Sequence, residues 1–255
     1  MDHHLHDFIS TLSNTFMTRP NNIIGMRLIT LNLTRPNASV EFYGCPMQCK
    51  YCSHTTAMFK DYNIDQVVHA LSDNGIRSVF IGGAEPSLHQ KETLDLINIL
   101  HKRGKNILLK TTGHDPDFAA STKGMVSRYV LELKTPLDDP QSFSRLTTYN
   151  LERSKEQLEN IKRTLDILKG EKVRATLRII PDLYDTNMVE RIAQDLTGHV
   201  DELLITQFLS NQNDVSFTGS YNPGPSQEMM FEMGKVARRH IPRVRIRGNG
   251  FDETL

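Results

Sequence analysis

The sequence contains no tryptophan, carries no net charge and has only three cysteines. Its 255 residues include 30 basic and 30 acidic side chains, so no global field draws the chain toward nucleic acid or anionic lipid. The apolar runs are too short to cross a bilayer. The N-terminal stretch MDHHLHDFIS lacks the charged-then-apolar order of a secretory signal. We therefore expect a soluble cytoplasmic protein with no membrane partner and no nucleic-acid partner.

The three cysteines lie within one stretch of eight residues, CPMQCKYC, as Cys45, Cys49 and Cys52. Three thiols cannot all pair within one chain, and these lie too close together to staple distant segments. This usage favours a metal role in a reducing compartment. Because the chain has no other cysteine, it has no thiols for auxiliary clusters.

Short apolar runs alternate with longer amphipathic runs, which is the βα pattern of a parallel sheet. Six βα steps predict an α/β fold, a partial (β/α)6 TIM-like barrel with parallel strands. Residues 1–36 are expected to form an N-terminal helix and an extra loop, and residues 37–255 the barrel domain. The predicted strands are 38–44, 77–83, 105–111, 128–134, 173–179 and 202–208.

Capping residues place the predicted helices between these strands. Asn63 is expected to begin a helix that Gly75 ends, and Ser154 one that Gly170 ends. A third helix ends at Gly104. Two more are predicted within 187–198 and 226–240.

The cysteine loop follows the first predicted strand, at the edge where parallel α/β proteins build their sites. The C-x3-C-x2-C spacing lets three sulfurs face one centre, and thiolates select iron–sulfur clusters or zinc. Zinc usually takes a fourth protein ligand, which His54 could supply. A four-iron cluster would keep one iron open to an outside molecule, which favours catalysis.

A second motif, FIGGAEPSL at 80–88, follows the second predicted strand. Gly82 and Gly83 have no Cβ to keep a ligand from the backbone, Glu85 supplies a carboxylate and Pro86 fixes the turn. An amino group bound to iron would find backbone carbonyls and a carboxylate here.

Together the two motifs resemble those of radical S-adenosylmethionine (SAM) enzymes. CPMQCKYC, with Tyr51 before the last cysteine, resembles their C-x3-C-x-aromatic-C signature, and GGAEP resembles their GGE(P) motif. Further similarity is to the glycyl-radical-enzyme activases, the family of pyruvate formate-lyase activating enzyme, and covers roughly residues 38–210. It extends through KTTGH, YVLELKTP, TLRIIPDLYD and ELLITQFL.

The resemblance implies that Cys45, Cys49 and Cys52 bind three irons of a 4Fe–4S cluster, and that SAM occupies the fourth. It places Tyr51 near the adenine. By the same resemblance, the amino group of SAM is held by Gly82, Gly83 and Glu85. The residues around the cofactor are Thr111, Thr112, Glu132, Lys134, Arg178 and Gln207. Among these, the candidate catalytic residues are Glu132, Lys134 and Arg178.

Glu132 and Lys134 are two residues apart on a predicted strand, so they share one face. They could form an interior ion pair that serves only to satisfy both charges. Alternatively, they contact the ribose and carboxylate of the cofactor.

Several positions depart from the activase pattern. Lys110 stands where activases have an acidic residue, Gln207 where they have a histidine, and Ala84 is inserted into GGEP. Near the C-terminus, RVRIR (243–247) predicts an edge strand whose arginines share one face. Those arginines are either a solvated edge or a docking surface for an acidic partner or a phosphate-bearing substrate.

The resemblance implies that an electron from flavodoxin or ferredoxin splits SAM into methionine and a 5′-deoxyadenosyl radical, which takes hydrogen from a substrate. Three functions stay open. The first is an activase acting on a glycyl radical enzyme. The second is a radical enzyme for a small molecule or nucleobase, like 7-carboxy-7-deazaguanine synthase. The third is a non-enzymatic module that binds zinc or a cluster.

Overall fold

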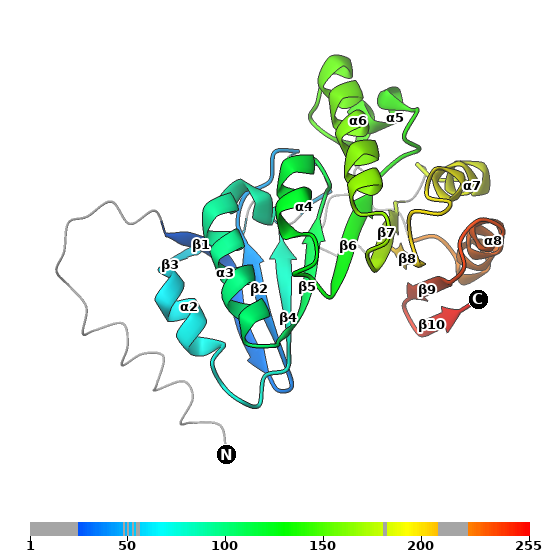
Figure 1. Cartoon of the computed structure of the whole chain (residues 1–255). Coiled ribbons are helices and arrows are strands. Elements are labelled where there is room, and N and C mark those ends of the chain that lie inside the picture. Colours follow the sequence, from blue (N-terminus) through cyan, green and yellow to red (C-terminus); the bar gives the residue numbers. More distant parts are fainter. Residues whose placement is uncertain are drawn as a thin grey trace.

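The computed structural model describes residues 25–47, 49, 51–52, 54, 57–180, 183–208 and 224–255. This part of the chain forms one ten-stranded sheet in the order β10-β9-β8-β7-β6-β5-β4-β2-β1-β3 (Figure 1). Its two outer strands do not pair with each other, so the described sheet stays open. The architecture is an α/β fold of the partial-barrel kind, as predicted.

The middle of the sheet consists of parallel strands that bring their C-terminal ends to one edge. The sequence predicts six of them, and the seventh is β9. The parallel strands are β2 (Asn37–Phe42), β4 (Ser78–Gly83), β5 (Asn106–Thr111), β6 (Arg128–Leu133), β7 (Val173–Ile179), β8 (Glu202–Gln207) and β9 (Val244–Gly248).

Antiparallel strands extend both sides of this core. On one side β1 (Met26–Thr34) pairs with β2, and β3 (Lys60–Tyr62) pairs with β1. The prediction of an extra loop just before residue 37 is therefore wrong, because strand β1 occupies most of the described residues 25–36. Residues 1–24, where the N-terminal helix was expected, lie outside the described residues. On the other side β10 (Phe251–Thr254) pairs with β9. The arginine-rich β9 is thus not the edge strand, since β10 covers it.

The helices lie on one face of the sheet (Figure 1). Helix α3 packs against α2 and α4, helix α6 against α4 and α5, and α7 against α8. Two of them, α4 and α5, were not predicted from the sequence. Each nevertheless begins with an Asp N-cap followed by proline, which is a typical helix start. The helices are α2 (Ile64–Ala70), α3 (Gln90–Lys102), α4 (Pro116–Thr122), α5 (Pro140–Leu146), α6 (Leu151–Ile167), α7 (Thr186–Asp195) and α8 (Gln227–Arg238), with a 3-10 turn, η2 (Pro86–His89).

Two helix boundaries differ from the prediction. Helix α2 begins at its predicted cap, Asn63, but ends at Ala70, well before Gly75. Helix α6 begins one turn earlier than predicted, because the Asn150 side chain caps it. Ser154 is buried inside the helix and donates its hydroxyl hydrogen to the Asn150 carbonyl.

Alternation along the strands separates two faces. Tyr129, Leu131 and Leu133 of β6 are buried on the helix side, where the Tyr129 hydroxyl donates to Thr122 of α4. Glu132 therefore lies on the opposite face, which we call the inner face.

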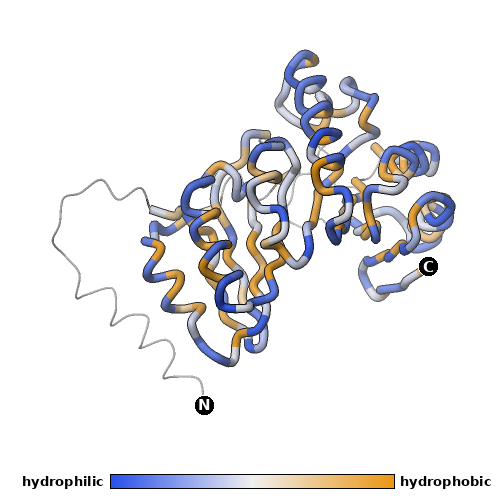
Figure 2. Tube along the Cα trace, viewed as in Figure 1, coloured by the Kyte–Doolittle hydropathy of each residue, from blue (hydrophilic) through white to orange (hydrophobic). Residues whose placement is uncertain are grey.

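Figure 2 shows apolar strands beside helices with hydrophilic outer turns. Among the described helices, none combines the length and apolar character needed to span a bilayer.

Candidate functional site

The three cysteines lie in the loop after β2, at the C-terminal edge of the parallel strands. None of the three forms a disulfide, and Cys49 is buried whereas Cys45 and Cys52 are partly buried. Two backbone carbonyls of the loop accept hydrogen bonds from neighbouring segments. The Glu85 N–H donates to the Gly44 carbonyl at 2.9 Å, and the Thr148 hydroxyl donates to the Met47 carbonyl at 3.0 Å. The chain thus brings the cysteine loop and the GGAEP loop together, as predicted.

The environment of the thiols differs from one cysteine to the next. Burial raises the pKa of Cys45 to about 12 and also raises the pKa of Cys49. At Cys52 burial acts in the same direction, but hydrogen bonds with His54 outweigh it and the pKa is lowered. Because metal ligation requires thiolates, metal uptake must displace protons from the two more buried thiols.

Three thiolates in one loop are ligands of the kind that iron–sulfur clusters and zinc both take. Among the described residues, no three His, Cys, Asp or Glu side chains are grouped closely enough to hold a single metal ion. A zinc ion needs its sulfur ligands about 2.3 Å from one point, whereas a cubane attaches each thiolate to a different iron. His54 Nδ1 lies 3.7 Å from Cys52 Sγ.

Beside this loop, Glu132 on the inner face of β6 lies between two ammonium groups. Its Oε1 accepts from Lys134 Nζ at 2.9 Å, and its Oε2 lies 2.6 Å from Lys110 Nζ of β5. Lys134 also donates to the Tyr51 hydroxyl at 2.8 Å. The predicted Glu132–Lys134 ion pair is therefore present, and Tyr51 links it to the cysteine loop.

The charges of this cluster stabilise one another despite burial. At Glu132 burial opposes ionisation, but Lys134 and Lys110 hold its pKa well below the usual range. Burial disfavours the Lys134 ammonium as well, and Glu132 and Tyr51 more than compensate, so its pKa lies well above the usual value. Two cations and one anion leave a net positive charge in this cluster. At Cys49, Lys134 offsets only part of the effect of burial, so the pKa of that thiol stays raised.

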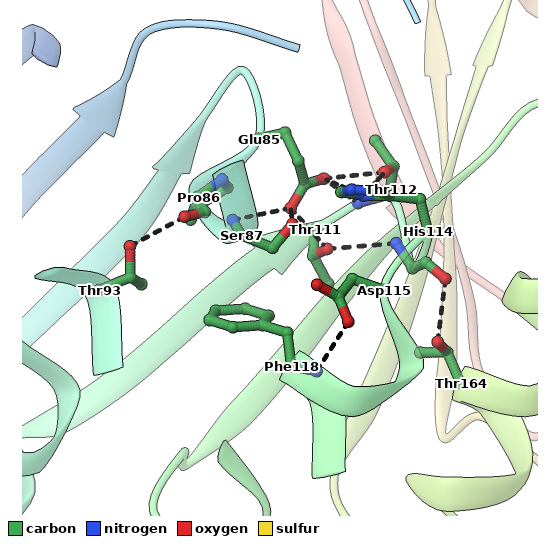
Figure 3. A network of polar contacts seen from close by, with 11 residues as sticks. Glu85, Pro86, Ser87, Thr93, Thr111, Thr112, His114, Asp115, Phe118 and Thr164 are labelled. Carbon is green, nitrogen blue, oxygen red and sulfur yellow. Dashed lines mark hydrogen bonds and ion pairs between the residues drawn. The ribbon is translucent and has the colours of Figure 1, made fainter. Parts of the chain in front are cut away.

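Glu85 forms a second, separate network with hydroxyl and backbone donors (Figure 3). Its Oε1 accepts from the Ser87 N–H, the Ser87 hydroxyl and the Thr111 hydroxyl, at 2.9–3.2 Å. Its Oε2 accepts from the Thr112 N–H and hydroxyl at 2.7 and 2.8 Å. The side chain is fully buried, so the predicted contact between Glu85 and the SAM amino group stays a prediction that would require bonds to be exchanged.

Packing within the fold explains why the motif has glycine at positions 82 and 83. Gly83 has φ +90°, and a Cβ there would lie 2.7 Å from the backbone N and O of Phe42. A Cβ on Gly82 would meet the Phe80 ring at 2.6 Å and Lys110 Cβ at 3.1 Å. Both glycines thus permit close packing of β4, and the β2–β4 register continues through them. Ala84 follows the strand and does not bulge it.

The remaining predicted residues lie farther along the sheet. Arg178 is on the inner face of β7 and is exposed. Gln207 ends β8, and both ends of its amide are occupied: Nε2 donates to the Pro225 carbonyl at 2.6 Å and Oε1 accepts from the Asn249 N–H at 2.8 Å. Among the described residues, neither side chain bonds to the Glu132 cluster or to the cysteine loop.

Sequence reasoning missed several residues of the site. The Tyr184 hydroxyl donates to the Lys134 carbonyl, Ser87 supplies two donors to Glu85, and His114 lies 3.8 Å from Glu85. Ser87 lies two residues after Glu85, within the GGAEPSL segment, so its local spacing could have marked it. Tyr184 and His114 act on residues far along the chain, and no local pattern marks them. Lys110 stands out in the sequence as a departure, but its partner Glu132 is visible only in the sheet register.

A family model for the radical SAM superfamily matches residues 41–196, more than half of the chain. The chain belongs to the radical SAM superfamily. This confirms the resemblance drawn from the cysteine and GGAEP motifs. Enzymes of this family use a 4Fe–4S cluster and SAM, so the protein is an enzyme of radical chemistry.

Individual relatives are distant. A Methanocaldococcus jannaschii protein, provisionally named a glycyl-radical enzyme activating enzyme, is 24% identical over 229 residues, covering 86% of this radical SAM chain and 92% of its own. A radical SAM methyltransferase from Sphaerobacter thermophilus has a TM-score of 0.61 at 18% identity, over 86% of this chain and 68% of that one. TYW1 with a lysine-pyruvate adduct has a TM-score of 0.60 at 16% identity, over 83% and 76%. The solved structures share the fold.

Proposed function

We propose that Cys45, Cys49 and Cys52 bind three irons of a 4Fe–4S cluster, and that the amino and carboxylate groups of SAM complete the fourth. The observation that carries this proposal is the juxtaposition of three cysteine thiols in one loop with the Glu132–Lys134 pair, of which Lys134 is buried and Glu132 partly buried. When bound and reduced, the cluster supplies the electron that splits SAM into methionine and a 5′-deoxyadenosyl radical, which abstracts hydrogen from a substrate.

The chain itself positions the cofactors. Tyr51 lies within the cysteine loop and accepts a hydrogen bond from Lys134, so it fixes the loop relative to β6. The positive excess around Glu132 favours the SAM carboxylate, and the backbone of Gly82 and Gly83 is the proposed contact for the amino group. Cys49 is buried, and Cys45 and Cys52 are partly buried, so the thiols are partly shielded from solvent.

For the substrate, the first candidate is a glycyl residue of a partner enzyme. It rests on the name of the M. jannaschii relative, which aligns along most of both chains. Flavodoxin or ferredoxin is the proposed electron donor, and the cytoplasm the proposed compartment. The second candidate is an anionic small molecule, favoured by the inner-face arginines described below.

Anaerobic reconstitution with iron and sulfide tests the proposal. We expect a brown protein with about four irons per chain that forms 5′-deoxyadenosine from SAM and dithionite, and a Cys45→Ala, Cys49→Ala, Cys52→Ala variant with neither property. A colourless wild-type protein that binds one zinc would overturn the proposal. Deuterium transfer into 5′-deoxyadenosine from a labelled glycine-loop peptide would identify the activase function.

A further inference from the structure

The inner face carries arginines on the strands beyond the cysteine loop. The register places Arg178 of β7 beside Thr206 of β8, and Thr206 beside Arg247 of β9. Ile246, the neighbour of Arg247, packs against Gly234 of α8 on the helix side. Arg247 therefore points to the same inner face as Arg178, near the C-terminal edge.

Arg178 differs from the other arginines of this face. Arg174 Nη2 lies 3.0 Å from Glu202 Oε2. Arg245 donates hydrogen bonds from Nε and Nη2 to the two carboxylate oxygens of Asp252. Arg178 is exposed, and among the described residues no side chain or backbone group bonds to it. A guanidinium carries five donors in a fixed fork that matches carboxylates and phosphates.

Arg247 is held in place while part of its fork stays open. Its Nε donates to Asp252 Oδ2 at 2.9 Å, and within the described residues its two terminal nitrogens form no bond. The side chain is 48% exposed. The turn after Arg247 is anchored by Gln207, whose Oε1 accepts from the Asn249 N–H. Gln207 thus positions the β9–β10 hairpin.

The local charge is strongly positive although the whole chain is neutral. On the inner face of the described strands β5–β10, including Lys134 just after β6, seven cations face three acids. An excess of this size attracts and orients anions. The cations are Lys110, Arg128, Lys134, Arg174, Arg178, Arg245 and Arg247, and the acids are Glu132, Glu202 and Asp252.

We propose that Arg178 and Arg247 bind a carboxylate or phosphate group of the substrate above Thr206. This site lies on β7–β9, whereas the cysteine loop follows β2 and the Glu132 cluster spans β5–β6. The inference deepens the proposed function by naming the substrate class, a molecule with an anionic oxygen group. It assigns Arg178 to the substrate and not to SAM.

Binding of two probes, inorganic phosphate and citrate, to the reconstituted enzyme tests the site by isothermal titration calorimetry. Arg178→Gln and Arg247→Gln should each weaken binding about tenfold, because each removes a charge-assisted pair, and the double variant should show no binding. The matched control is Arg163→Gln on α6, an exposed arginine without a partner among the described residues, which should bind like wild type. Phosphate binding alone indicates a phosphate substrate, and citrate binding alone a carboxylate.

The proposal is overturned if neither probe binds, or if the arginine variants bind like the control. It is also overturned if Arg178→Gln weakens SAM binding and leaves probe binding unchanged. Formation of 5′-deoxyadenosine, measured in the same preparations, reports the proposed function separately. An enzyme that cleaves SAM but binds neither probe retains that function and loses only the anion site.

Discussion

Glu85, which is buried, and Glu132, which is partly buried, lie near the same edge of the sheet, and the chain satisfies their carboxylates in different ways. Neighbouring residues of β5 supply both: Thr111 donates to Glu85, and Lys110 pairs with Glu132 on the inner face. Hydroxyl and backbone N–H donors occupy both oxygens of Glu85, and His114 lies beside Oε2. Ammonium groups surround Glu132 and leave a net positive charge.

The difference indicates that Glu85 has a structural role, whereas Glu132 is placed to support ligand binding. A carboxylate whose oxygens are saturated by the protein joins loops, here those after β4 and β5. A carboxylate held between two lysines sets their positions and leaves their spare donors for another anion. Three changes should break or sharpen this comparison.

The largest effect is expected for Glu132→Gln. It leaves the buried Lys134 ammonium without its anionic partner, which should lower the free energy of unfolding by about 3 kcal/mol. Formation of 5′-deoxyadenosine per folded molecule should fall at least tenfold, since Lys134 and Tyr51 lose their arrangement. Urea unfolding and product quantification measure the two effects.

Glu202→Gln is the matched control for this change. Glu202 is another acid of the inner face and is buried, but it lies at the start of β8 and pairs with Arg174. Its replacement should destabilise the protein and leave SAM cleavage per folded molecule unchanged. Equal loss of cleavage in both variants would contradict a special role for Glu132.

A smaller effect, mainly on stability, is expected for Glu85→Gln. The new amide group would face donors, at a cost of about 2 kcal/mol at pH 7. Burial alone would raise the pKa of Glu85, but its His114 and Thr112 contacts lower it below the ordinary value. A lowered folded-state pKa contributes stability above the unfolded pKa of about 4.3, and that stability is lost as pH falls further.

The difference in unfolding free energy between wild type and Glu85→Gln should therefore shrink below about pH 4. Urea titrations from pH 7 to pH 3 measure it. A difference that stays constant over this range would show that Glu85 contributes shape and not charge.

The smallest effect is expected for Lys110→Met. Lys110 is partly exposed, with 22% of its side-chain surface accessible, so its pair with Glu132 should contribute only about 1 kcal/mol. Lys134 continues to hold Glu132 in this variant. A loss in unfolding free energy as large as that of Glu132→Gln would mean that Lys110, and not Lys134, is the main partner.

The sequence by itself determined the six predicted parallel strands, because buried strands read as apolar runs of fixed length. It also determined the family, since three cysteines in CPMQCKYC and the following GGAEP lie at strand ends. The shared face of Glu132 and Lys134 followed from a period of two.

The tertiary structure alone decided how distant groups pair. Lys110 meets Glu132 only through the β5–β6 register, and Glu85 is saturated only because the β5 loop folds over it. Likewise, β9 is an interior strand because Phe251–Thr254 returns beside it. Such contacts join residues far apart in the chain, and no local periodicity encodes which partner each side chain will find.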